Sequence, residues 1–230
     1  MKLWKCKEFD VSHHNSSMKV GTDAILLGAW VANGSYKKIL DVGTGSGIIA
    51  LCVAQRFLEA SITAIDIHPE SIMEAHSNFQ RNEWSNRMKA KEVSLQSLDD
   101  SHYDLIVSNP PYFAANTGSL SPKTARMNAR HNNSLALNDL IHLSSNLLMD
   151  GGRLAIVIPF DAEFELNDSG MFELERTVVY GKEGKKAERL LLLFEKGSKV
   201  KDSKISKLTI RQEDQSYSND YIALTKDFYL

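Results

Sequence analysis

The chain has 230 residues, of which 43% are hydrophobic, which is enough to bury the core of one α/β domain. Its formal net charge of -2 excludes nucleic-acid binding through an overall positive charge, so any such binding requires a local basic patch. Two cysteines, Cys6 and Cys52, are too few for a disulfide framework or a zinc site. The N-terminal stretch lacks a signal-peptide core, and no apolar run reaches the roughly 18 residues of a membrane span. We therefore expect a cytoplasmic protein without membrane attachment.

Short apolar runs alternate with helical patterns from about Lys37 onward, which is typical of βαβ units on a mostly parallel sheet. The predicted strands are, in chain order, Lys38–Val42, Ser61–Ile67, Ala90–Leu95, Tyr103–Ser108, Arg153–Ile158, Glu173–Tyr180 and Arg189–Glu195. The predicted helices are Ser46–Phe57, one beginning at Pro69, and one marked by Leu137, Ile141, Leu147 and Leu148. The sequence therefore predicts an α/β fold with a seven-stranded, mostly parallel sheet and helices on both faces.

A glycine-rich stretch, Asp41-Val42-Gly43-Thr44-Gly45-Ser46-Gly47, connects the first predicted strand to the first helix. Glycines permit a tight turn there and let the backbone approach a ligand closely. The second strand ends at Asp66, about twenty residues later, where a carboxylate accepts hydrogen bonds from the ribose hydroxyls of a nucleoside cofactor. The alternatives are an ordinary strand-to-helix turn or a dinucleotide site. Asp66 fits NAD and S-adenosylmethionine equally, so this motif leaves the cofactor open.

The fourth predicted strand is followed by Asn109-Pro110-Pro111-Tyr112. Two consecutive prolines leave the backbone little freedom, so this corner presents Asn109 and Tyr112 rigidly. The amino group of a base is a poor nucleophile because its lone pair is delocalised into the ring. The Asn109 side-chain oxygen and the Pro110 carbonyl can each accept one of its N–H bonds, which directs the lone pair at a methyl donor. Tyr112 can stack on the base. The alternative is a proline-rich loop exit that covers the core.

Together these motifs resemble the class I, Rossmann-like methyltransferases that carry an NPPY motif. A closer resemblance lies in Met18–Asp23, in Leu26–Trp30 and in the C-terminal Leu224–Tyr229. These stretches resemble the bacterial tRNA1(Val) adenine-N6-methyltransferase family. The resemblance spans essentially the whole chain and implies S-adenosylmethionine as cofactor and tRNA as substrate. It further implies that the target is the adenine immediately 3′ of the anticodon of valine tRNA.

The resemblance also assigns roles to individual residues. The chemistry is assigned to Asn109, Pro110, Pro111 and Tyr112. Lys19 and Thr22 are expected beside the methionine end of the cofactor. The remaining expected cofactor contacts are Asp41, Gly43, Thr44, Gly45, Gly47, Asp66, Ile67, Leu95 and Gln96. We expect one methyltransferase domain over residues 1–230, with a cofactor-flanking segment at 1–36, a core at 37–196 and a C-terminal extension at 197–230.

Two basic stretches are candidates for holding RNA. Lys123, Arg126 and Arg130 follow the proline corner without an acidic residue among them. Lys182, Lys185 and Lys186 precede the last predicted strand, which in class I enzymes usually runs antiparallel to its neighbours. The turn before such a strand lies at the edge of the sheet that ligands favour. We expect the two stretches to form the sides of an RNA channel, with solvated loops as the alternative. The lysine-rich stretch at 196–207 is more typical of a solubilised edge strand.

Several other functions remain open at this point. The proline corner also suits the amide nitrogen of glutamine, as in a protein glutamine N5-methyltransferase, but about 36 residues precede the first strand, too few for the added helical domain of that family. Another base amino-methyltransferase, including one acting on DNA, and a non-catalytic scaffold are the further alternatives. The seven histidines share no ligand spacing, so we expect no metal. No obligate protein partner is indicated.

Overall fold

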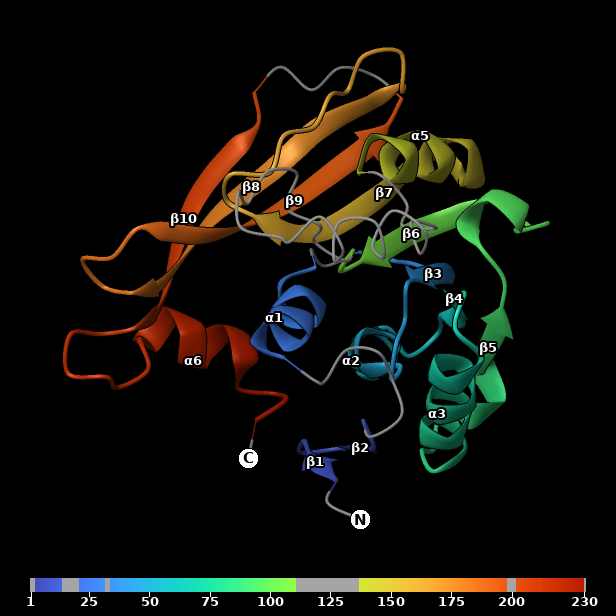
Figure 1. Ribbon diagram of the computed structural model, residues 1–230, viewed down its shortest axis with the longest axis horizontal. Coiled ribbons are helices and arrows are strands. Elements are labelled where there is room, and N and C mark those ends of the chain that lie inside the picture. The colour runs from blue at the N-terminus through green and yellow to red at the C-terminus, as the bar shows by residue number, and fades with distance from the viewer. Residues whose placement is uncertain (1–2, 14–20, 32–33, 111–136, 198–201, 230) are drawn as a thin grey trace, which may run out of the picture.

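The computed structural model describes residues 3–13, 21–31, 34–110, 137–197 and 202–229. An eight-stranded sheet forms its centre, with the strand order β10-β8-β9-β7-β6-β3-β4-β5 (Figure 1). All paired neighbours in this sheet are parallel, except that β9 runs antiparallel to β7 and β8. The strands are β3 (Lys38–Val42), β4 (Ser61–Asp66), β5 (Met88–Glu92), β6 (Tyr103–Ser108), β7 (Leu148–Pro159), β8 (Met171–Lys182), β9 (Ala187–Lys196) and β10 (Lys204–Arg211).

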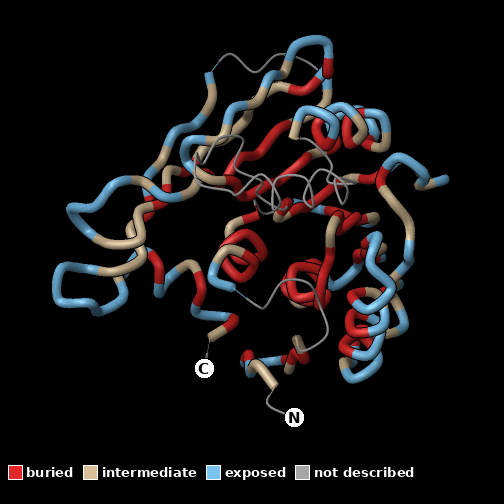
Figure 2. Tube along the Cα trace, in the orientation of Figure 1, coloured by how far each residue is buried: buried red, intermediate tan, exposed pale blue. Residues whose placement is uncertain are grey.

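Helices cover both faces of the sheet, as predicted (Figure 1). The helices are α1 (Thr22–Trp30), α2 (Ile48–Arg56), α3 (Pro69–Gln80), α5 (Leu137–Leu147) and α6 (Asn219–Thr225). Buried side chains of α1, α2, α3 and α6 share one hydrophobic cluster, whereas those of α5 belong to the cluster on the opposite face. Figure 2 shows the central strands buried along most of their length, as expected for parallel strands covered on both sides.

The remaining described elements are short. Two-residue strands β1 (Trp4–Lys5) and β2 (Asp10–Val11) pair antiparallel in a separate sheet. One-turn 3-10 helices lie at Ser85–Arg87 and Leu95–Ser97, on either side of β5. The N-terminal segment is fixed to α3 because the side chain of Asn78 hydrogen-bonds both the N–H and the carbonyl of Ser12, at 2.9 and 2.8 Å.

The predicted count of seven strands was wrong, because β10 adds an eighth strand parallel to β8. In β10 Leu208 alone is buried, and the exposed lysines agree with the solubilised edge strand expected near 196–207, which the predicted strand list had left out. The third strand occupies Met88–Glu92 instead of Ala90–Leu95, because Leu95 begins a 3-10 turn. Leu148 was expected in a helix but is the first residue of β7, where it pairs with Tyr103.

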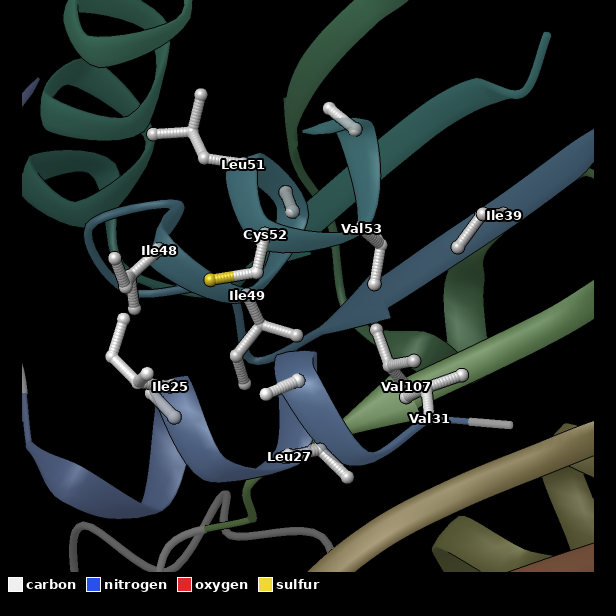
Figure 3. Close-up of a cluster of buried hydrophobic side chains, with 14 of the residues drawn as sticks. Ile25, Leu27, Val31, Ile39, Ile48, Ile49, Leu51, Cys52, Val53 and Val107 are labelled. Carbon is white, nitrogen blue, oxygen red and sulfur yellow. The ribbon is translucent and has the colours of Figure 1, made fainter. Parts of the chain in front are cut away.

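The core beneath β3 and β6 depends on a close approach of α1 to α2 (Figure 3). Figure 3 shows Ile25 of α1 beside Ile48 of α2, with Ile49 of α2 pointing toward α1. The two helices meet at Gly28, where an added Cβ would lie 2.4 Å from the Cβ of Cys52. The absence of a side chain at position 28 therefore sets the distance between α1 and α2.

We expect Gly28→Ala to lower the free energy of unfolding by about 1–3 kcal/mol, because the methyl group overpacks the contact with Cys52. Helix propensity alone predicts the opposite, a gain of about 1 kcal/mol. Urea unfolding measures the difference. Ser77→Ala, at an exposed position of α3, is the matched control and should change stability by less than about 0.5 kcal/mol. A stabilised Gly28→Ala protein would contradict the packing described here.

Candidate active site

The site lies at the carboxyl edge of the sheet, where β3 and β6 end side by side. Val42 pairs with Ser108 in the parallel register, and the Ser108 hydroxyl donates a hydrogen bond to the Val42 carbonyl at 2.8 Å. The glycine loop follows Val42 directly and Asn109 follows Ser108 directly. Strand order changes direction at β3, since β4 lies on one side and β6 on the other. Ligands of open α/β sheets bind at such a switch point.

The glycine loop has a backbone that other residues adopt only with strain. Gly43, Gly45 and Gly47 have φ angles of +71°, +54° and +83°. The N–H groups of Gly43 and Thr44 both donate to the carbonyl of Ile65, at 2.9 and 3.0 Å, which ties the loop to the end of β4. At Gly47 an added Cβ would lie 2.5 Å from the Phe79 ring. The loop is thus held against β4 and α3 at the N-terminus of α2.

Asp66, at the end of β4, fastens the same loop from the other side. Its Oδ2 accepts a hydrogen bond from the N–H of Gly45 at 2.9 Å, and its Oδ1 accepts one from the N–H of His68 at 3.0 Å. The side chain is 8% exposed. A carboxylate offers about four acceptor positions, so both oxygens retain capacity for ribose hydroxyls.

Asp41 lies wholly inside the protein beneath the loop. Its Oδ2 accepts hydrogen bonds from the Thr44 hydroxyl at 2.6 Å and from the N–H of Ala50 at 3.2 Å. Burial raises the pKa of Asp41 to about 7, and the bonds from Thr44 and Ala50 oppose that rise. Its Oδ1 is buried and has no hydrogen-bond partner among the described residues. Asp41 therefore holds the turn through Oδ2.

The loop fits the nucleoside cofactor predicted for it. An added Cβ at Gly43 or Gly45 would meet no atom of the described residues within 4 Å, so none of these residues blocks close approach of a ligand to the loop. Ile67, next to Asp66, is 42% exposed, and Gln96 is exposed on the neighbouring turn. Leu95 is 5% exposed and packs in the core cluster on the α5 face. Of these three described candidates for cofactor contact, Ile67 and Gln96 are thus exposed and Leu95 is not.

The other predicted site residues divide into two groups. Lys19, Pro111, Tyr112, Lys123, Arg126 and Arg130 lie outside the described residues. Asn109 is half-buried and Pro110 is buried at the end of β6. Lys182 ends β8, while Lys185 and Lys186 are exposed in the turn before β9. Because β9 is antiparallel, this turn lies at the same edge of the sheet as Asn109, as the topology predicted.

Thr22 begins α1 and is exposed. It lines a cavity formed mainly by the ends of β8 and β10 and the start of β9, and the described lining of this cavity includes neither the glycine loop nor Asn109. Asp23, Arg189, Arg211 and Tyr217 line the same cavity, and the sequence assigned no individual role to Asp23 or Arg211. Asp23 and Arg189 are 166 residues apart and form an ion pair at 2.8 Å, a contact that no local pattern indicates.

No helix among the described residues is long and apolar enough to cross a membrane. No three histidine, cysteine, aspartate or glutamate side chains among these residues come together as a metal site.

Comparison with known proteins agrees with the chemistry predicted for this edge. The family model described as "Methyltransferase small domain" matches residues 15–171. A tRNA1(Val) (adenine(37)-N6)-methyltransferase of Bacteroides fragilis strain YCH46 is 39% identical over 238 residues, covering 99% of this chain and 98% of that protein. The protein of the same name from Aeromonas salmonicida is 38% identical over 229 residues, covering 97% of this chain and 95% of its own.

A solved structure gives the same fold at greater distance. A protein of Agrobacterium tumefaciens, described as a predicted O-methyltransferase, superposes with a TM-score of 0.67 at 20% identity. The match covers 90% of this chain and 96% of that one. The sheet and helices described above are therefore a class I methyltransferase fold.

The buried state of Asp41 predicts a pH dependence of stability. An unfolded chain loses this proton near pH 4, whereas the folded protein keeps it up to about pH 7. The folded state binds more protons in this window, so this group lowers stability as pH rises from about 4 to 7. Asp41→Asn has no proton to lose. Between pH 5 and pH 8 we expect the free energy of unfolding to decrease less in Asp41→Asn than in the wild type. The two decreases should differ by about 1–3 kcal/mol.

Urea unfolding at both pH values measures this difference. Asp150→Asn, which makes the same change at an exposed position of β7, is the matched control and should follow the wild-type pH dependence. Equal slopes for Asp41→Asn and wild type would show that Asp41 is already ionised throughout the window.

Proposed function

We propose a function from the family of this chain, which belongs to the tRNA1(Val) (adenine(37)-N6)-methyltransferases. The chain transfers a methyl group from S-adenosylmethionine to the N6 amino group of adenine 37 in a valine tRNA. The observation that carries the proposal is the pairing of Val42 with Ser108, which brings the glycine loop and Asn109 together at one edge of the sheet. We also propose that the enzyme works in the cytoplasm as a single methyltransferase domain.

The cofactor half of the site belongs to β3 and β4. S-adenosylmethionine supplies an activated methyl group when bound. Gly43 and Gly45 let the backbone approach it, because nothing described lies within 4 Å of their would-be side chains. Asp66 keeps the loop in place through the Gly45 N–H and offers its remaining acceptor capacity to the ribose. Lys19 and Thr22 are the proposed cofactor contacts from the N-terminal side, and Thr22 lies where it also lines the cavity at the ends of β8 and β10.

The substrate half of the site is the corner after β6. The Asn109 side-chain oxygen and the Pro110 carbonyl each accept one N–H of the adenine amino group, which concentrates its lone pair on nitrogen. Tyr112 stacks the extruded base, and stacking of this kind contributes roughly 1–3 kcal/mol. Catalysis then rests on in-line positioning of the amino nitrogen and the methyl carbon, and the proton is lost from the product nitrogen afterwards.

Asn109→Ala should lower kcat for tRNA methylation by about 10²–10³-fold, the usual cost of removing one hydrogen-bonding group aimed at the reacting centre. Binding of S-adenosylmethionine should remain near the wild-type value, because the glycine loop and Asp66 are unchanged. Transfer of labelled methyl groups to valine tRNA, followed by nucleoside analysis, measures the rate. Asn146→Ala, at an exposed position of α5, is the matched control. Full activity of Asn109→Ala would refute the assigned role.

Charge reversal in the turn between β8 and β9 tests the proposed RNA contacts. Lys185 and Lys186 are exposed at the same sheet edge as Asn109. Reversing both charges should weaken tRNA binding by at least about tenfold and should reduce its salt dependence, because fewer phosphates are neutralised. The double change Lys89→Glu with Lys91→Glu on β5, at the opposite end of the strand order, is the control. Unchanged affinity of the Lys185 and Lys186 variant would remove this turn from the RNA path.

A further inference from the structure

A cavity lies at the carboxyl edge of the sheet, and its described lining contains neither a residue of the glycine loop nor Asn109. Its volume is about 400 Å³. It lies where the ends of β8 and β10, the start of β9, the first residues of α1 and the segment leading into α6 come together (Figure 1). The lining includes Gly181, Arg189, Arg211, Tyr217 and Tyr221.

Three of these side chains are layered one on another. The rings of Tyr217 and Tyr221 stack with centroids 5.1 Å apart and planes inclined by 27°. The guanidinium of Arg211 lies over the Tyr217 ring, 4.2 Å from its centroid. Tyr221 is 2% exposed whereas Tyr217 is 44% exposed, so the layers run from the core out to the surface. Arg211 therefore rests on an aromatic support anchored in the protein interior.

Hydrogen bonds fix the plane of the Arg211 guanidinium. Its Nη1 donates to the Gln215 carbonyl at 2.6 Å and its Nη2 donates to the Tyr217 hydroxyl at 3.0 Å. The carbonyl of Arg211 accepts a bond from the N–H of Glu183, which connects this residue to the turn carrying Lys185 and Lys186. A guanidinium held flat in this way has lost most of its rotational freedom before any ligand arrives.

The rest of the lining combines the apolar side chains of Val179 and Ile210 with charged groups of both signs. Arg189 pairs with Asp23, and the Glu188 carboxylate lies over Gly181, where an added Cβ would be 2.4 Å from it. A nucleotide has groups that match this lining: a planar base for the guanidinium, hydroxyl donors for the carboxylates and a phosphate for the basic side chains. Arginine planes are a recognised stacking surface for unpaired bases.

Topology relates the cavity to the site of methyl transfer. β8 lies three positions from β6 in the strand order and runs in the same direction, so both strands end at one edge. With neighbouring strands about 4.8 Å apart, the cavity lies roughly 14 Å from the corner that presents Asn109. An RNA segment running along this edge passes both places.

We propose that this cavity binds a nucleotide of the RNA substrate other than the target adenine, with its base stacked on the guanidinium of Arg211. The inference rests on the proposed function, because it takes RNA to be the ligand of this edge. Tyr217 is then a positioning residue, which supports Arg211 from behind. The bound nucleotide anchors the RNA while the target base occupies the corner at Asn109.

The test compares Arg211→Lys and Arg211→Ala in the full-length enzyme. Lysine keeps the charge but has no plane to stack on, so both variants should weaken valine tRNA binding by about 5- to 100-fold. The salt dependence of binding should stay at the wild-type value in Arg211→Lys, because no positive charge is lost. Binding of S-adenosylmethionine should be unchanged in both variants. Tyr217→Leu, which removes the support beneath the guanidinium, should weaken tRNA binding in the same direction.

Lys204→Ala is the matched control, because it removes a positive charge from the same strand at the amino end of the sheet. Wild-type tRNA affinity in both Arg211 variants would overturn the site. Wild-type affinity in Arg211→Lys alone, with loss in Arg211→Ala, would overturn stacking in favour of a charge contact. Methylation of valine tRNA by the wild-type enzyme is measured in parallel. Its absence would reject the proposed function, whereas its presence with unaffected Arg211 variants would reject this inference alone.

Discussion

The parallel pairing of β3 with β6 is the constraint on which the rest of the site depends. Each strand delivers one half of the proposed chemistry at its carboxyl end, and the register of Val42 with Ser108 brings the two halves to the same level. Both strands are buried on both faces, so a shift in register would move apolar side chains out of two hydrophobic clusters. The core thus fixes the relative position of the glycine loop and Asn109 without help from a ligand.

Two carboxylates stabilise the loop that this pairing positions. Asp41 bonds to Thr44 from below, and Asp66 bonds to Gly45 from the end of β4. Asp41 is wholly buried, and its raised pKa is the cost of placing a carboxyl group in the core. Positive φ angles at the glycines permit the tight turn that both side chains hold. The loop is therefore rigid before it meets a cofactor, which reduces the entropy lost on binding.

The reversal of β9 gives the same edge a second functional region. Because β9 is antiparallel, the turn after β8 and the end of β10 lie at the edge that already carries the loop and Asn109. Basic, aromatic and guanidinium groups gather there, although the whole chain has a net charge of -2. These groups are the local patch that the proposed RNA contacts require, and they lie beside the acidic groups of Asp23 and Glu188.

The sequence by itself determined the fold class, because apolar strands alternate with helical patterns along the chain. It also determined the positions of the glycine loop, Asp66 and Asn109, because each directly follows or ends a strongly apolar strand. The family relationship, supported by relatives 38–39% identical over nearly the full length, favours a tRNA base over a glutamine side chain. The tertiary structure decided what depends on distant partners. The pairing of Asp23 with Arg189 and the layering of Arg211 on Tyr217 and Tyr221 require β9, β10, α1 and α6 to meet. Polar edge strands such as β10 carry no periodic apolar signal, because one side of the strand faces water and few of its side chains are buried.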